Sequence, residues 1–77
     1  MKIQGQFGKN VRHFREAKGW SQDKLSEVSG LHRTYISGIE RGVRNPTIKI
    51  VYEVAVALEI KVSQLFEQKI GGRNNDR

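Results

Sequence analysis

Cysteine is absent from this 77-residue chain, and the sequence holds one proline and two histidines. Without cysteine the chain can form neither a disulfide nor a cysteine-based zinc site, and two histidines are too few for a metal cluster. We therefore expect no cofactor. No apolar run approaches the length of a membrane span, and the N-terminus MKIQGQFGKN lacks a secretory apolar segment. These features predict a cytoplasmic protein without a membrane partner.

Acidic residues are also scarce, with eight Asp and Glu against fourteen Lys and Arg, for a formal net charge of +6. A basic balance favours an anionic partner, either nucleic acid or an acidic membrane surface. A chain this short holds one domain, which we assign to residues 1–70, and its small core favours association with a second copy. The tail 71–77 has no apolar residue and is expected to be disordered.

Helical periodicity dominates the rest of the sequence. Phe7, Val11 and Phe14 recur at i, i+4 and i+7 and predict a helix over residues 6–18. A second helix is expected over residues 22–29, after Ser21 as its N-cap, and a third over residues 33–41. Both are short, and the turn between them contains Gly30. This arrangement is typical of a helix-turn-helix.

A fourth helix is expected over residues 48–58, with Thr47 as its N-cap. Its predicted inner stripe is Ile48, Val51, Val54, Ala55 and Leu58. Ile50, Val56 and Ala57 lie off that stripe, so this helix is either buried on two sides or meets a partner. A short fifth helix should begin at residue 62 or 63, with Leu65 and Phe66 facing inward. The prediction is an all-α, compact five-helix domain.

The segment from Arg33 to Thr47 carries the most chemical information. Ile36 and Ile39 should point into the core, which leaves Arg33, Thr34, Ser37 and Arg41 exposed on the third helix. Arg33 can reach a guanine edge with paired donors, and Thr34 can meet a thymine methyl group or a phosphate. Tyr35 offers a ring and a hydroxyl, although partial burial would explain it equally simply.

Positive charge gathers in the same segment, where four basic residues and one acidic residue lie between Arg33 and Lys49. Arg41, Arg44 and Lys49 suit phosphate contacts, and Gln22 could add a hydrogen bond at a helix N-terminus. The alternative is that these basic residues are ordinary solvent-exposed surface charges. Gly38 in mid-helix indicates close approach to a surface, which is either DNA or the preceding helix.

Glu40 is the one acid in that basic segment and would repel phosphate if it were exposed. We expect a partly buried ion pair with Arg15 of the first helix, which is a structural role. Catalysis has little support, because there is no cysteine nucleophile, no glycine-rich phosphate loop and no carboxylate pair at metal spacing. We therefore expect a protein that is not an enzyme and that binds no small molecule.

Several motifs occur in order and at familiar separations: FREAKGWSQDKLSEVSGL, TYISGIERG, NPTIKIVYEVAVALEI and SQLFE. Over residues 7–67 the chain resembles the Cro/C1-type (XRE-type) helix-turn-helix family. The block LHRTYISGIERGVRNPT is similar to the controller proteins of restriction–modification systems. The resemblance implies a transcriptional regulator that binds palindromic double-stranded DNA as a homodimer, with its third helix in the major groove.

The resemblance also implies roles for individual residues. The base- or groove-reading positions are Arg33, Thr34, Tyr35 and Ser37. The backbone or flanking contacts are Gln22, Arg41, Arg44, Asn45 and Thr47. Arg15 and Glu40 match the inner ion pair of the family. The dimer surface would comprise Ile60, Leu65, Phe66 and Ile70. His32 and Ser26 depart from the residues usual in the family, and His32 puts the cap of the third helix in doubt.

Two other functions remain open at this point. A phage-type repressor or the antitoxin of a toxin pair would share the same fold. A basic adaptor that binds protein or RNA belongs to a different class, and the wide apolar face of residues 48–58 permits it.

Overall fold

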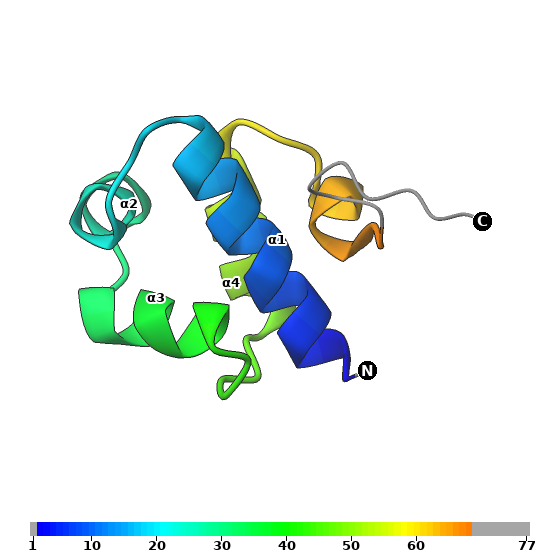
Figure 1. Cartoon of the computed structure of the whole chain (residues 1–77). Helices are drawn as coiled ribbons and strands as arrows, with labels where there is room; N and C mark the ends of the chain where they lie inside the picture. Colours follow the sequence, from blue (N-terminus) through cyan, green and yellow to red (C-terminus); the bar gives the residue numbers. More distant parts are fainter. Residues whose placement is uncertain (1, 69–77) are drawn as a thin grey trace.

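The computed structural model describes residues 2–68, which form four α-helices and one 3-10 helix. The elements are α1 (Ile3–Ala17), α2 (Gln22–Ser29), α3 (Arg33–Glu40), α4 (Ile48–Leu58) and η1 (Val62–Phe66). Helix α1 crosses in front of α4, α3 runs along the lower side of the molecule, and η1 lies on the side away from α2 (Figure 1). The all-α class is confirmed, and the expected fifth helix is a single 3-10 segment.

The core forms where α1 packs on α3 and η1 and where α2 packs on α3 and α4. Its fully buried side chains include Phe7, Val11, Leu25, Ile36, Ile39, Val54, Leu58 and Leu65. The two predicted N-caps are present, since Ser21 Oγ accepts from the backbone N–H of Lys24 and Thr47 Oγ1 accepts from that of Ile50. Short polar caps and apolar stripes therefore account for most helix boundaries.

Helix α4 differs from its predicted stripe at two positions. Ile48 was expected to face inward, but it is 87% exposed because it is the first residue of the helix and lies beyond the core. Ala57 was expected off the stripe, but it is buried. Its burial follows from α4 contacting α2 on one side and α1 and η1 on the other, which is the two-sided packing that the apolar composition indicated.

Helix α1 begins at Ile3, three residues earlier than predicted, and ends at Ala17. Glycine disfavours a helix interior, yet Gly5 and Gly8 both lie within α1. At Gly8 the reason is tertiary, because α1 here crosses the end of α3. A Cβ atom added to Gly8 would lie 2.1 Å from the carbonyl oxygen of Ile39 and 3.0 Å from that of Glu40. The absence of a side chain at Gly8 thus lets the two helices approach closely.

A buried ion pair joins the same two helices. Arg15 Nε lies 2.7 Å from Glu40 Oε2 and Arg15 Nη2 lies 3.0 Å from Oε1, so the guanidinium grips the carboxylate with two parallel hydrogen bonds. The side chains are 10% and 5% exposed. The hydrogen bond to Glu40 raises the pKa of Arg15 above its usual value, against the opposing effect of burial. This is the pair expected from the sequence.

The network extends to the start of α2. Arg15 Nη1 donates to the carbonyl oxygen of Trp20 at 2.7 Å, and Gln22 Nε2 donates to Glu40 Oε1 at 3.0 Å. One carboxylate and one guanidinium therefore connect α1, the entry to α2 and the end of α3. A buried charge is tolerated only when it is paired and hydrogen-bonded, and here the network supplies both.

A second buried polar group holds η1 against α1. Asn10 is 2% exposed, and its Nδ2 donates to the carbonyl oxygens of Leu65 and Glu67, each at 2.8 Å. Gln6 Nε2 supports it by donating to Asn10 Oδ1 and to the same Glu67 carbonyl. The C-terminal segment is thus held by side-chain hydrogen bonds as well as by Leu65.

Leu65 and Phe66 behave differently from one another. Leu65 is 0% exposed, so it belongs to the core of one chain, and its expected place on a dimer surface is wrong. Phe66 was expected to face inward, but it is 38% exposed, and its ring stacks on that of Phe7 with the centroids 5.4 Å apart. Ile70 and the tail 71–77 lie outside the described residues.

The close crossing of α1 and α3 makes a paired prediction. Gly8→Ala should lower the free energy of unfolding by roughly 1–3 kcal/mol, because the new methyl group meets backbone atoms that cannot shift cheaply. Gly5→Ala is the matched control: nothing lies within 4 Å of its added Cβ, so this variant should gain up to about 1 kcal/mol in helix propensity. Urea unfolding followed by circular dichroism measures both. Equal stabilities would contradict the close crossing.

The ion pair makes a second prediction. Arg15→Ala should cost about 3–5 kcal/mol, because Glu40 would stay buried without its main partner. Arg12→Ala is the control, since Arg12 pairs with Glu16 on the surface and exposed pairs contribute about 1 kcal/mol at most. Thermal unfolding should separate the two variants widely, and similar melting temperatures would refute the structural role of Arg15.

Candidate nucleic-acid interface

The turn between α2 and α3 is built from small residues. Gly30 adopts φ 79°, a left-handed conformation that ends α2 and that glycine adopts without strain. Ser26 Oγ donates to the carbonyl oxygen of Leu31, and Ser29 Oγ accepts from the backbone N–H of Leu31. Ser26, unusual for the family, therefore satisfies a turn carbonyl that α3 does not reach. The two helices are held at a defined angle as a result.

Helix α3 separates an inner from an outer face. Ile36 and Ile39 are each 1% exposed and pack in the core, while Arg33 and Thr34 at the start of the helix are exposed. Tyr35 and Ser37 are half-buried at the edge between the two faces. The four candidate base-reading residues thus share the first five positions of α3, two of them exposed and two half-buried.

Each arginine of this surface contacts a neighbouring side chain. Arg41 Nη1 donates to Ser37 Oγ at 2.7 Å. The guanidinium carbon of Arg44 lies 5.4 Å from the centre of the Tyr35 ring, within range of a cation–π contact. Restraint of this kind lowers the entropy that these long side chains lose when they bind a ligand.

Arg33 contacts an acid. Its Nε lies 3.3 Å from Asp23 Oδ1 in the first turn of α2, so this cation too has a partner. Asp23 and Arg33 are ten residues apart, and helical periodicity does not predict their contact.

Gly38 has an explanation that the sequence analysis did not foresee. The close approach expected at Gly38 was to DNA or to α2. Within the chain, the side chain of Arg44 passes over it, and an added Cβ would lie 2.8 Å from Arg44 Cγ. Gly38 therefore leaves room for Arg44 to fold back toward Tyr35.

Several candidate flanking contacts are already engaged within the chain. Gln22 uses one amide hydrogen for Glu40, and the hydroxyl of Thr47 caps α4. Arg41, Arg44 and Asn45 are exposed beyond the end of α3. His32 makes no side-chain cap hydrogen bond to α3, which bears out the doubt about that cap.

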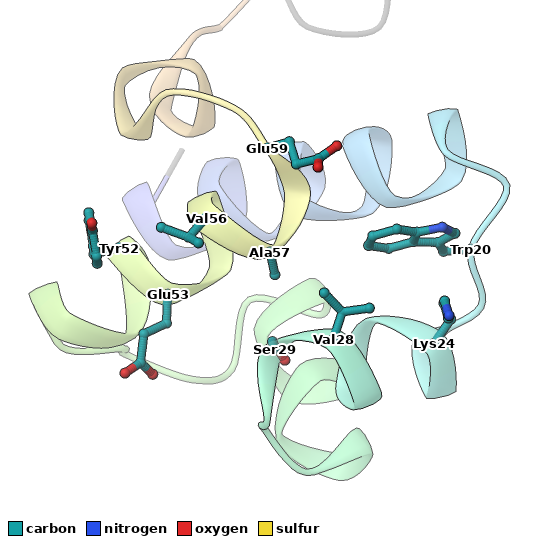
Figure 2. Close-up of a pocket in the computed structure, with 9 residues that line it drawn as sticks. All are labelled: Trp20, Lys24, Val28, Ser29, Tyr52, Glu53, Val56, Ala57 and Glu59. Atoms are coloured by element: carbon teal, nitrogen blue, oxygen red, sulfur yellow. The ribbon is translucent and has the colours of Figure 1, made fainter.

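A surface groove lies away from these residues. This groove, of about 540 Å³, runs between α2 and α4, with Trp20, Val28 and Ala57 on its apolar side and Glu53 and Glu59 among its lining residues (Figure 2). Val28 is 45% exposed and points into this groove. None of the candidate DNA-contacting residues lines it.

A second apolar surface lies beside η1. Ile3, Ile48 and Phe66 are 64%, 87% and 38% exposed and, with Phe7, Pro46 and Val51, line a hollow of about 200 Å³. We call these exposed residues the η1 patch. Of the residues expected on a dimer surface, Phe66 belongs to it, while Ile60 is half-buried against the core.

No helix within residues 2–68 is long and apolar enough to cross a membrane. No group of three or more His, Asp or Glu side chains in that range could hold a metal ion.

Three residues were missed by the sequence analysis. Asn10 left a signal, because it falls on the same helical face as Phe7 and Phe14, where a polar residue indicates a buried hydrogen bond. Gly8 and Asp23 left none, since their partners are distant in sequence and only the folded chain brings them together.

Comparison with known proteins agrees with this geometry. A family model described as helix-turn-helix matches residues 11–65. The control protein C.SmaI of Serratia marcescens is 41% identical over 69 residues, which cover 90% of this chain and 82% of that protein. The crystal structure of the restriction–modification controller protein C.AhdI from Aeromonas hydrophila superposes with a TM-score of 0.79 at 43% identity, covering 82% of this chain and 96% of that one.

A third relative was solved with DNA. The controller protein C.Esp1396I, as a tetramer in complex with its natural 35 base-pair operator, superposes with a TM-score of 0.78 at 36% identity, covering 86% of this chain and 87% of that one. The family resemblance inferred from the sequence is therefore confirmed. This chain belongs to the helix-turn-helix family, together with the controller proteins of restriction–modification systems.

Proposed function

We propose that this protein is a sequence-specific transcriptional regulator that binds palindromic double-stranded DNA as a homodimer and controls a restriction–modification operon. The observation that carries the proposal is the two-faced α3, whose isoleucines are buried while Arg33 and Thr34 are exposed at its N-terminal end. The similarity to controller proteins over most of the chain supports the specific role.

The physical argument for DNA begins with shape. The major groove of B-DNA is about 12 Å wide and accepts one α-helix. Helix α3 lies at the surface, with an exposed N-terminal turn and no element covering its outer face in the described chain (Figure 1). In helix-turn-helix proteins it is the N-terminal part of the second helix that reaches the base edges.

Charge supports the same docking. Arg41 and Arg44 flank the end of α3, where phosphates would lie, and Lys49 follows in α4. Glu40, the one acid of this segment, has its charge buried with Arg15 and does not oppose the phosphates. Glu40 therefore does not neutralise the exposed basic residues, which leaves a positively charged surface of the kind that binds DNA.

The proposed role is binding without catalysis, in the cytoplasm, where the target DNA lies. Neither a cofactor nor a small-molecule effector is needed for it. The polar residues with well-defined contacts, such as Arg15 and Asn10, serve to position helices.

For the dimer we propose the η1 patch in place of the surface expected from the sequence. Leu65 is unavailable there, whereas Ile3, Ile48 and Phe66 offer exposed apolar area around one hollow. Segment η1 itself lies on the side of the molecule away from α2 (Figure 1). A two-fold axis through this patch leaves the N-terminal end of α3 at the far side of each protomer. Two such helices about 34 Å apart would meet successive major grooves.

DNA recognition is tested by selecting bound duplexes from a random library and measuring affinities for the selected site. Arg33→Ala should lose about 1–3 kcal/mol of discrimination at one base pair in each half-site. Arg44→Ala should weaken binding to all sequences and reduce the salt dependence by about one ion per protomer. Recovery of no common site, or equal binding by wild type and both variants, would contradict the proposal. Equal competition by RNA would favour an adaptor instead.

Dimerisation has its own test. Ile48→Glu should weaken self-association by about 2 kcal/mol or more, because it places a charge in the patch without disturbing the fold. Val56→Glu is the control, since Val56 is 56% exposed but faces the groove between α2 and α4. Sedimentation velocity over a concentration series measures both. If Ile48→Glu dimerises like the wild type, the patch is not the interface.

A further inference from the structure

The contact between Asp23 and Arg33 links the first turns of the two helices of the helix-turn-helix. Asp23 Oδ1 lies 3.3 Å from Arg33 Nε, and the two side chains are 81% and 53% exposed. Both therefore reach into solvent on the side proposed to face DNA. Ion pairs this exposed contribute little to folding, because water competes for both charges. The contact can instead affect function, because it restrains the position of the Arg33 guanidinium.

The position of Asp23 on the guanidinium determines which N–H donors of Arg33 can meet a base. Arginine has five N–H donors, of which Nε carries one and the two terminal nitrogens carry four. The ion-pair contact of Asp23 is at Nε, and none of the hydrogen bonds within residues 2–68 uses the terminal nitrogens of Arg33. Guanine offers two acceptors on its major-groove edge, O6 and N7, which accept a pair of parallel N–H bonds. With Nε occupied, Arg33 would approach such an edge with its two terminal nitrogens.

We propose that Asp23 is a positioning residue for base recognition, which holds the Arg33 guanidinium for end-on recognition of a guanine. This inference rests on the proposed function, and it adds a specificity-determining residue to it. Arg33 then loses less side-chain entropy on binding the correct base. The carboxylate also offsets the charge of Arg33, which reduces its attraction to phosphates at sites without guanine.

Two substitutions on α2 separate this role from a simple change of charge. Asp23→Ala removes the carboxylate beside Arg33. Glu27→Ala removes another exposed acid of the same helix, one turn beyond Asp23, whose carboxylate lies 3.9 Å from Lys24 Nζ and is not paired with Arg33. Both variants gain one positive charge and should bind unrelated duplex DNA more tightly by similar factors.

The measurement is discrimination at single base pairs. The duplex selected by the wild-type protein is varied one base pair at a time, and affinities are measured at two salt concentrations. Asp23→Ala should lower discrimination about threefold to tenfold at the base pair that Arg33→Ala affects, and at no other. Glu27→Ala should leave discrimination unchanged. In the Arg33→Ala background, Asp23→Ala should have no further effect at that base pair.

Other results would overturn the inference. Equal discrimination by Asp23→Ala and Glu27→Ala would reduce Asp23 to a surface charge. An effect that persists in the Arg33→Ala background, or that falls on another base pair, would show that Asp23 acts independently of Arg33. If the wild-type protein itself selects no duplex, the proposed function fails first and the inference falls with it. If it selects one and only Asp23 proves neutral, the inference alone fails.

Discussion

The ion pair between Arg15 and Glu40 is the contact that positions the elements of the helix-turn-helix relative to each other. Its charges are largely withdrawn from water, so each requires the other, and the fork of the guanidinium admits one geometry. Because Trp20 and Gln22 bond to the same pair, the entry to α2 and the end of α3 are located together. Apolar burial holds the domain together, but this network sets the direction in which α3 points.

Close backbone approach complements the ion pair. Gly8 brings α1 onto the carbonyl end of α3, and Gly38 lets Arg44 cross α3 on its way to Tyr35. In both places, atoms from another part of the chain occupy the space that a side chain would fill. Other side chains on the surface of α3 are also restrained: Arg33 contacts Asp23, and Arg41 donates a hydrogen bond to Ser37. Preorganisation of this kind suits a protein that reads a rigid groove.

The two apolar surfaces differ in their relation to α3. The η1 patch is held in place through Asn10, whose buried hydrogen bonds fix the C-terminal segment on α1. The groove between α2 and α4 contains Glu53 and Glu59 and is distinct from both the reading face and the η1 patch. A domain with so small a core thus divides its remaining apolar area between two places, and only the first adjoins the segment that the family resemblance associated with dimerisation.

The sequence by itself determined the helices, the two side-chain caps, the inward isoleucines of α3 and the pairing of Arg15 with Glu40. The helices, caps and inward isoleucines follow from local residue patterns, and the ion pair follows from the unfavourable exposure of one acid in a basic segment. Both can be read from the sequence alone. The tertiary structure alone decided the start of α1, the exposure of Ile48, the burial of Leu65 and the partners of Gly38 and Asp23. Each of these depends on a neighbour distant in sequence, and periodicity describes which face a residue occupies without saying what covers that face.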